Sequence, residues 1–310
     1  VLTPGSGLTI GEKLNGMNHS VPFVEVNRKT QEEIGKQVKD AQIQSLSRRG
    51  ISKEIEVIIV RVLVDENDPE LKEQEDAEIL TQVDAFLRMR DEHLRMRYPP
   101  TQPPEASLAF GGKTTGLPVG FHIQGKGFSQ VPFSKPVGKF YSETEAIELM
   151  QRFGWSMGYF KGPKEEGYRR VFASPKSKAI LEEDLRKIKE ALQKGKLVIT
   201  GIGGGIAVIV RADGSLVYPD AVLDKDYTAN LLAKELEVDN FIIITGVPGA
   251  PLYYKTPREY FPRELNLSQV HKYTYQGEFP KGNMGPKVWS LADFVKDRAR
   301  RNRKVLAKLS

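Results

Sequence analysis

An apolar run rich in β-branched residues constrains the fold more than any other feature. The segment EIEVIIVRVLVD, from Glu54 to Asp65, is long enough for a strand buried on both faces of a parallel sheet. Downstream, the expected elements are a helix at about 177–194, the strands KLVITG and GGGIAVIV, a DG turn, a helix from about Thr228 to Glu237, the buried strand NFIIITG and a final helix from Pro286. This alternation predicts an α/β fold with a mainly parallel sheet and ligands at the carboxyl ends of its strands.

The first half of the chain predicts two more helices and a separate lobe. Apolar residues recur at near-helical spacing over 29–48 and along one broad face of 71–97. Paired prolines end the second helix, and residues 98–138 are rich in proline and glycine without a sustained period. The predicted domains are a core of residues 1–69 and 139–310 and an inserted or enlarged lobe of residues 70–138.

Composition excludes several classes of function. The 310 residues are 39% hydrophobic and 28% charged, as in ordinary globular proteins, and no cysteine is present for disulfide or thiolate chemistry. The four histidines show no metal-ligand spacing, and no apolar run approaches the roughly 20 residues of a membrane span. The net charge of +6 favours an anionic partner, such as a nucleotide, RNA or an acidic protein.

The basic C-terminal segment DRARRNRKVLAKLS has two interpretations. We favour a solvated helix end, where lysine and arginine complement the helix dipole. Nucleic-acid binding is the alternative, and it is less favoured because no aromatic residues are interleaved for base stacking.

Glycine-rich turns follow three of the predicted strands: PGSG at 4–7, GIGGG at 201–205 and TGVPG at 245–249. Backbone N–H groups of such turns can cradle phosphate oxygens, and the N-terminus of a following helix adds a favourable dipole. The alternative is a tight turn that needs glycine only for a positive φ angle. None of the three matches a P-loop or a dinucleotide-binding turn, so both interpretations stay open.

Three lysines lie in turn settings that favour a phosphate site: Lys135 in SKPVG, Lys225 in LDKDY and Lys287 in GNMGPKV. Phosphoryl transfer depends mainly on positioning and positive charge, because negative charge spreads over the oxygens of the transferred group. Asp226 can orient the lysines or help to hold Mg²⁺. Gly282 and its neighbours place an unusual glycine-rich turn at the start of the last helix.

These segments resemble carbamate kinase, of the amino-acid kinase family. NMGPKV is similar to the family's SMGPKV, and AVLDKDYTANLLAKEL is similar to its AVIDKD segment and the helix that follows. SKPVGKFY resembles TKPVGPFY, VRVLVDENDP resembles TQTLVDPNDP, and GYRRVFASP resembles GWRRVVPSP. The resemblance covers most of 1–65 and 130–295. It implies a three-layer αβα sandwich around a largely parallel sheet. It also implies phosphoryl exchange between ATP and carbamate, giving ADP and carbamoyl phosphate with Mg²⁺.

The resemblance also implies roles for individual residues. Lys135 would belong to the lobe that closes on carbamoyl phosphate. Lys225 and Lys287 would bracket the transferred phosphoryl group, and Asp226 would organise the lysines. The phosphate- and nucleotide-binding residues that it implies are Gly5, Gly7, Gly203, Gly204, Gly205, Thr245, Tyr253, Gly282 and Met284.

Several segments depart from the family pattern. The family begins with a strand ending in GGN, and we expect this sequence to start after that element. Ser6 and Leu8 replace the Asn and Pro of the family's GNGPQVG loop, and Gly246 replaces the Asp of its TDV. A segment at about 70–128 is added. We also expect the last strand of the family to be absent, because the chain ends in a basic helix.

Two functional hypotheses follow. The departures favour a degenerate, non-catalytic subunit of a larger assembly, which could still bind nucleotide, and this is the hypothesis that we prefer from the sequence. The four residues Lys135, Lys225, Asp226 and Lys287 favour an active carbamate kinase instead. An RNA-associated assembly protein is a third hypothesis, which rests on charge alone.

The partners would be a second copy of the chain, the default for carbamate-kinase-like proteins, or other protein subunits. A first residue other than Met fits cleavage after import into mitochondria and fits a trimmed chain in the cytoplasm, so the compartment stays open.

Overall fold

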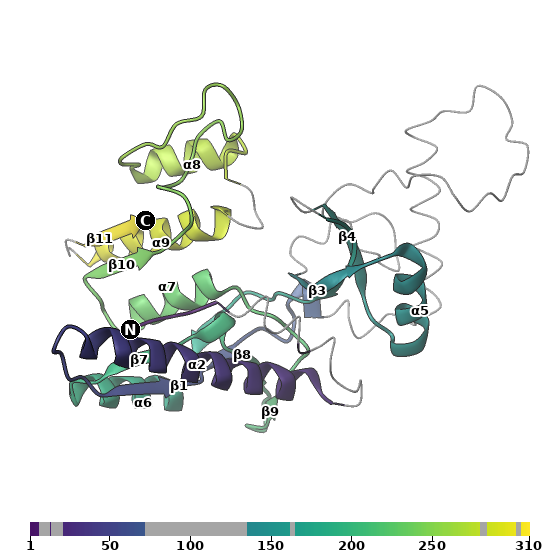
Figure 1. The fold of residues 1–310 in the computed structure, drawn as a ribbon, viewed down its shortest axis with the longest axis horizontal. Helices are drawn as coiled ribbons and strands as arrows, with labels where there is room; N and C mark the ends of the chain where they lie inside the picture. The colour runs from purple at the N-terminus through teal and green to yellow at the C-terminus, as the bar shows by residue number, and fades with distance from the viewer. Residues whose placement is uncertain (6–12, 14–20, 72–134, 162–164, 280–283, 302–304) are drawn as a thin grey trace, which may run out of the picture. The chain divides into compact units, whose positions relative to one another are not determined.

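The computed structural model divides the chain into two units, whose elements are labelled in Figure 1. The described residues are 1–5, 13, 21–71, 135–161, 165–279, 284–301 and 305–310. Unit 1 consists of Val1–Ser6, Asn27–Asp65 and Lys176–Ser310, and unit 2 of Gly7–Val26 and Glu66–Pro175. Residues 72–97 of the predicted helix and almost all of the predicted lobe at 70–138 lie outside the described residues, so both stay predictions.

Strands and helices alternate through unit 1, as the sequence predicts. Its strands are β1 (Ile55–Ile58), β2 (Arg61–Leu63), β6 (Ala179–Ile180), β7 (Leu197–Thr200), β8 (Ile206–Val210), β9 (Leu216–Val217), β10 (Asn240–Ile243) and β11 (Leu306–Leu309). Its helices are α2 (Phe23–Ser47), whose first residues belong to unit 2, α6 (Glu182–Gln193), the short 3-10 helix η1 (Ile202–Gly204), α7 (Lys225–Glu235), α8 (Leu267–Tyr275) and α9 (Met284–Arg300). The predicted starts of α7 and α9 were three and two residues too late.

Parallel pairing dominates the strands of unit 1. β1 and Leu2 both pair in parallel with β7, and they lie along its opposite edges. On one edge, the N–H of Leu197 donates to the carbonyl of Glu54, just before β1. On the other edge, the carbonyl of Val198 accepts from the N–H of Leu2 at 2.8 Å. β2 pairs in parallel with β8 in the order β6-β2-β8-β9, where the two outer strands are antiparallel. β10 pairs in parallel with β11. Contrary to the prediction, β10 is only half buried, since Ile242 is 50% exposed.

Helix α2 approaches β1 closely. Its Ile34 is buried beside Ile55 of β1 and Ile199 of β7. A Cβ atom at Gly35 would lie 2.4 Å from Cγ1 of Val57, so only glycine lets the helix pack at this distance from the strand.

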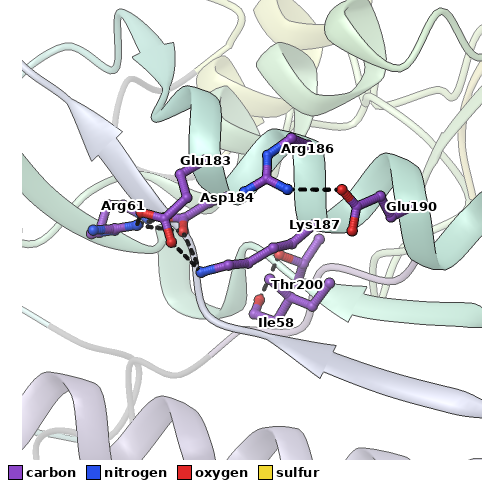
Figure 2. Close-up of polar contacts among 8 residues, drawn as sticks. All are labelled: Ile58, Arg61, Glu183, Asp184, Arg186, Lys187, Glu190 and Thr200. Atoms are coloured by element: carbon purple, nitrogen blue, oxygen red, sulfur yellow. Dashed lines mark hydrogen bonds and ion pairs between the residues drawn. The ribbon is translucent and has the colours of Figure 1, made fainter.

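Ion pairs fix the start of α6 to β2 (Figure 2). The buried carboxylate of Asp184 accepts hydrogen bonds from the backbone N–H of Arg61 at 2.8 Å, from its Nε at 2.8 Å and from its Nη2 at 2.6 Å. These bonds raise the pKa of Arg61 above its ordinary value. Hydrogen bonds from Lys187 and Arg61 lower the pKa of Glu183 to about 2. The first turn of α6 is thus held by a charge network rather than by a capping side chain.

The C-terminal residues form a strand, where the sequence predicted only a basic helix. The expectation that the last strand is absent is therefore wrong, because β11 pairs with β10. Phe241 of β10 packs against Phe294 of α9, with ring centroids 5.5 Å apart. The prediction that the basic C-terminal segment is a solvated helix end is also wrong for Arg298. This side chain is fully buried and donates to the carbonyls of Ala233 at 3.1 Å and Lys234 at 2.9 Å.

Unit 2 contains an antiparallel sheet and one described helix of its own. The sheet has the order β3-β5-β4, formed by β3 (Lys135–Tyr141), β4 (Met157–Lys161) and β5 (Glu166–Phe172). The helix α5 (Glu143–Phe153) begins with a capping box, in which Ser142 Oγ accepts from the N–H of Glu145 and the Glu145 carboxylate accepts from the N–H of Ser142. In the described parts of both units, no helix has the length and apolarity needed to cross a membrane.

Candidate phosphate site at the N-termini of α7 and α9

The candidate site is built on the first turn of α7. Asp224 is the N-cap residue, and its Oδ1 accepts a hydrogen bond from the N–H of Asp226 at 2.9 Å. This cap starts the helix at Lys225, so that Lys225 and Asp226 both occupy its first turn. The side chain of Tyr227 follows them. Burial raises the pKa of Tyr227, and the carboxylates of Asp224 and Asp226 raise it further, so its hydroxyl is neutral at physiological pH.

Two lysines meet at the carboxylate of Asp226, which is 5% exposed. Lys225 Nζ donates to Oδ1 at 2.6 Å, and Lys287 Nζ, from the first turn of α9, donates to Oδ2 at 2.8 Å. The structure therefore brings together three of the residues that the sequence singled out. The two ammonium groups and the Asp226 carboxylate leave one net positive charge, which the N-cap carboxylate of Asp224 partly offsets, and both oxygens of Asp226 are occupied by lysine.

The helices α7 and α9 run parallel to each other. Asp226 and Lys287 join their first turns, and Arg298 near the end of α9 donates to carbonyls in the last turn of α7. A helix carries roughly half a positive charge at its N-terminus, so two such ends at one place attract an anion in addition to the lysines. The arrangement suits a polyphosphate.

Gly5 lies beside Lys225. A Cβ atom at Gly5 would be 3.6 Å from both Cδ and Cε of Lys225, an ordinary van der Waals distance, so the N-terminal segment lies next to the lysine stem without requiring glycine there. The pairing of Leu2 with β7 and a hydrogen bond from Gly203 N–H to the carbonyl of Pro4, at 2.9 Å, hold this N-terminal segment in place. Gly7, the other predicted glycine of this turn, lies outside the described residues.

The glycines that follow β7 make close backbone contacts. The N–H groups of Gly203, Gly204 and Gly205 all donate to carbonyls within the chain. A Cβ atom at Gly204, where φ is +100°, would lie 2.7 Å from the carbonyl oxygen of Leu223. The tight-turn interpretation therefore explains why glycine is needed here, and nucleotide binding by these residues stays a prediction.

The remaining nucleotide-side residues lie on three segments of unit 1. Thr245 follows β10, and its N–H donates to the carbonyl of Ser310 at 2.6 Å. Tyr253 is 42% exposed and has a φ angle of 55°. Met284 is the first residue of α9 and is buried in the cluster around Leu252. Gly282 lies outside the described residues, and the nucleotide contacts of the other three stay predictions.

Lys135 belongs to unit 2. It is the first residue of β3 and pairs with Phe172 of β5. Its predicted contact with carbamoyl phosphate is not tested by the geometry of unit 1, where Lys225 and Lys287 lie. Among the described residues, no group of three or more acidic or histidine side chains is placed to hold a metal ion.

The contacts that align α7 with α9 do not follow from the sequence pattern. Asn230 Nδ2 and Lys234 Nζ both donate to Oδ2 of Asp293, at 2.8 and 2.7 Å. Residues 226, 230 and 234 follow each other at intervals of four, the spacing that places side chains on one helix face. That spacing signals a shared face on α7, but nothing in it identifies Asp293 as the partner.

Comparison with known proteins identifies the family of the chain. Residues 137–303 match the family model described as "Amino acid kinase family". A protein of Pyrococcus furiosus named carbamate kinase is 30% identical over 303 residues, which cover 95% of this chain and 76% of that protein. The chain belongs to the amino acid kinase family.

Other members of the amino acid kinase family show the same likeness. A protein of Thermoplasma volcanium named carbamate kinase is 39% identical over 163 residues, covering 53% of this chain and 51% of that one. The structure of carbamate kinase from Giardia lamblia bound to AMP-PNP matches with a TM-score of 0.65 and 25% identity, covering 96% of this chain and 75% of that one. The predicted fold class and the resemblance to carbamate kinase are therefore confirmed.

Proposed function

We propose that this amino acid kinase family member transfers a phosphoryl group between ATP and carbamate at the N-termini of α7 and α9. The observation that carries the proposal is the buried carboxylate of Asp226 with Lys225 and Lys287 bonded to its two oxygens. It fixes two cations next to two helix N-termini, which is the electrostatic environment that a transferring phosphoryl group needs. The named carbamate kinases among its relatives support the choice of carbamate.

Each residue of the proposed site has a defined task. Lys225 and Lys287 neutralise the charge on the oxygens of the transferred group, and Asp226 keeps both ammonium groups at a fixed separation. Gly5 brings the N-terminal segment next to the stem of Lys225. Lys135, in unit 2, keeps its predicted role of binding carbamoyl phosphate, which the resemblance to carbamate kinase supports.

The donor groups also fit a nucleotide polyphosphate. ATP or ADP would lie with its phosphates at Lys225 and Lys287 and its nucleoside toward Thr245, Tyr253 and Met284. The Giardia lamblia relative bound to AMP-PNP supports nucleotide binding. Lysine occupies both oxygens of Asp226, so Mg²⁺ would be held through the nucleotide phosphates, whose charge it would help to neutralise.

A non-catalytic, nucleotide-binding subunit is the second candidate function. The specific observation in its favour is that the N–H groups of Gly203, Gly204 and Gly205 already donate to carbonyls of the chain, so Lys225 and Lys287 would bind phosphate without these three backbone donors to stabilise a transition state. Such a subunit would act in a complex, in mitochondria or elsewhere, and the active enzyme would be a homodimer by default.

A coupled assay separates the two candidates. ADP and carbamoyl phosphate are supplied with Mg²⁺, and ATP formation is followed through hexokinase and glucose-6-phosphate dehydrogenase. We expect turnover by the unaltered chain and a fall of about 10²-fold or more in Lys287→Met, because one preorganised donor is worth roughly 10²–10³ in rate. Nucleotide binding without ATP formation would support the non-catalytic subunit.

A further inference from the structure

One face of α7 carries a series of polar contacts to α9. Asp226, Asn230 and Lys234 lie at successive turns of this face, and each of them bonds to a side chain of α9. The contact at Asp226 is the phosphate site. The next two both converge on Asp293, which lies six residues, or about 9 Å along the axis, from Lys287.

Asp293 is held from two directions. Its Oδ2 accepts from Asn230 at 2.8 Å and from Lys234 at 2.7 Å. Burial acts to raise the pKa of the Asp293 carboxyl, but the hydrogen bonds from Lys234 and Asn230 bring the pKa below its ordinary value. Asn230 is only 6% exposed, so its amide has a fixed position. Two donors one helical turn apart on α7 define a single axial position for Asp293.

We propose that Asp293 is a positioning residue, which sets the register of α9 along α7 and thereby holds the Lys287 ammonium on Asp226. This inference rests on the proposed function. A helix advances about 1.5 Å per residue, and a displacement of about 1 Å at reacting groups can cost roughly 10² in rate. Even a partial slide of α9 would therefore matter at Lys287.

Asp293 and Lys287 lie about 9 Å apart along the axis of α9, and Asp293→Asn, which removes the charge but keeps an acceptor oxygen, separates a geometric effect from a direct electrostatic one. Asp293 is also half exposed at its side chain, so variants of it should fold. These two points make substitution at Asp293 informative about register.

The test compares Asp293→Ala with Asp293→Asn, which keeps an acceptor oxygen. The matched control is Arg301→Gln, which removes ion pairs to Glu237 and to Asp297 near the far end of the same two helices. We expect kcat to fall about tenfold in Asp293→Ala, with KM for ADP changed less than about twofold, and Asp293→Asn to recover most of kcat. The control should keep its kcat.

A second readout does not depend on turnover. In protein labelled with [15N]lysine, the ammonium signal of Lys287 is assigned by its loss in Lys287→Arg. We expect this signal to shift in Asp293→Ala and to stay in place in Arg301→Gln. An unshifted signal, or a kcat within about twofold of the unaltered enzyme, would overturn the inference. If the unaltered protein shows no turnover, the proposed function fails and the ammonium signal alone decides the inference.

Discussion

Substitution of Asp226 by asparagine gives the sharpest energetic test of the site. The amide has the same shape as the carboxylate but can accept a hydrogen bond from one lysine only, and its NH₂ group would face the other ammonium. Removing one partner from a buried charge pair costs roughly 3–5 kcal/mol. Lys225 is 35% and Lys287 14% exposed at the side chain, so solvent screens part of this loss. We therefore expect the free energy of unfolding to fall by about 2–3 kcal/mol.

The same change should affect the reaction more than it affects stability. Two ammonium groups lose their common anchor, so we expect phosphoryl transfer to fall by about 10² or more. Urea unfolding gives the stability and the coupled assay gives the rate. Asp213→Asn, an equal charge change in the exposed turn between β8 and β9, is the control. If the folded Asp226→Asn variant loses less than tenfold in the rate of phosphoryl transfer, the anchoring role of this carboxylate is refuted.

Three further changes test the packing of unit 1. Asp184→Ala should lower the free energy of unfolding by roughly 3–5 kcal/mol, because it leaves the guanidinium of Arg61 without its buried partner. Glu190→Gln, which breaks the exposed pair with Arg186, should lower it by less than about 1 kcal/mol, and the urea midpoints of the two variants compare the losses. Glu183 should stabilise the fold above pH 4.5 and lose this effect as the pH falls toward 2, so the difference in urea midpoint between Glu183→Gln and the unaltered chain should shrink over that window. Gly35→Ala should lower the free energy of unfolding by about 1–3 kcal/mol, since its methyl group would clash with Val57. Adding Val57→Ala to this variant should restore part of the lost stability. An unchanged melting temperature in Gly35→Ala would contradict the close approach of α2 to β1.

The sequence carried much of the information about the site. The apolar run from Glu54 predicts one parallel strand, and the structure divides it into β1 and β2, which pair in parallel with β7 and β8 in different sheets. The segment KLVITG predicts a strand, and the structure contains it as β7. The LDKDY segment predicts charged residues at a helix start, and Asp224 provides that start by capping. These features are local: strand propensity, turn residues and a capping side chain act within a few residues, so a single sequence contains them.

Features set by distant segments could not be predicted in the same way. The segment LAKL reads as part of a basic helix, and it becomes a strand because β10 offers an edge for pairing. Arg298 looks like a solvated charge until the carbonyls of α7, 64 and 65 residues away in sequence, are placed next to it. Asp293 likewise gains its partners from another helix. In each case tertiary contact overrides the local pattern.

The central claim is that Lys225 and Lys287, beside two helix N-termini, bind a nucleotide polyphosphate. Isothermal titration of AMP-PNP with Mg²⁺ into the unaltered chain and into the double variant Lys225→Met/Lys287→Met tests it most directly. We expect binding by the unaltered chain and a loss of about 10²-fold or more in the double variant, since hydrogen bonds to charged groups contribute about 1.5–3 kcal/mol each. Equal affinity in the two proteins would contradict the claim.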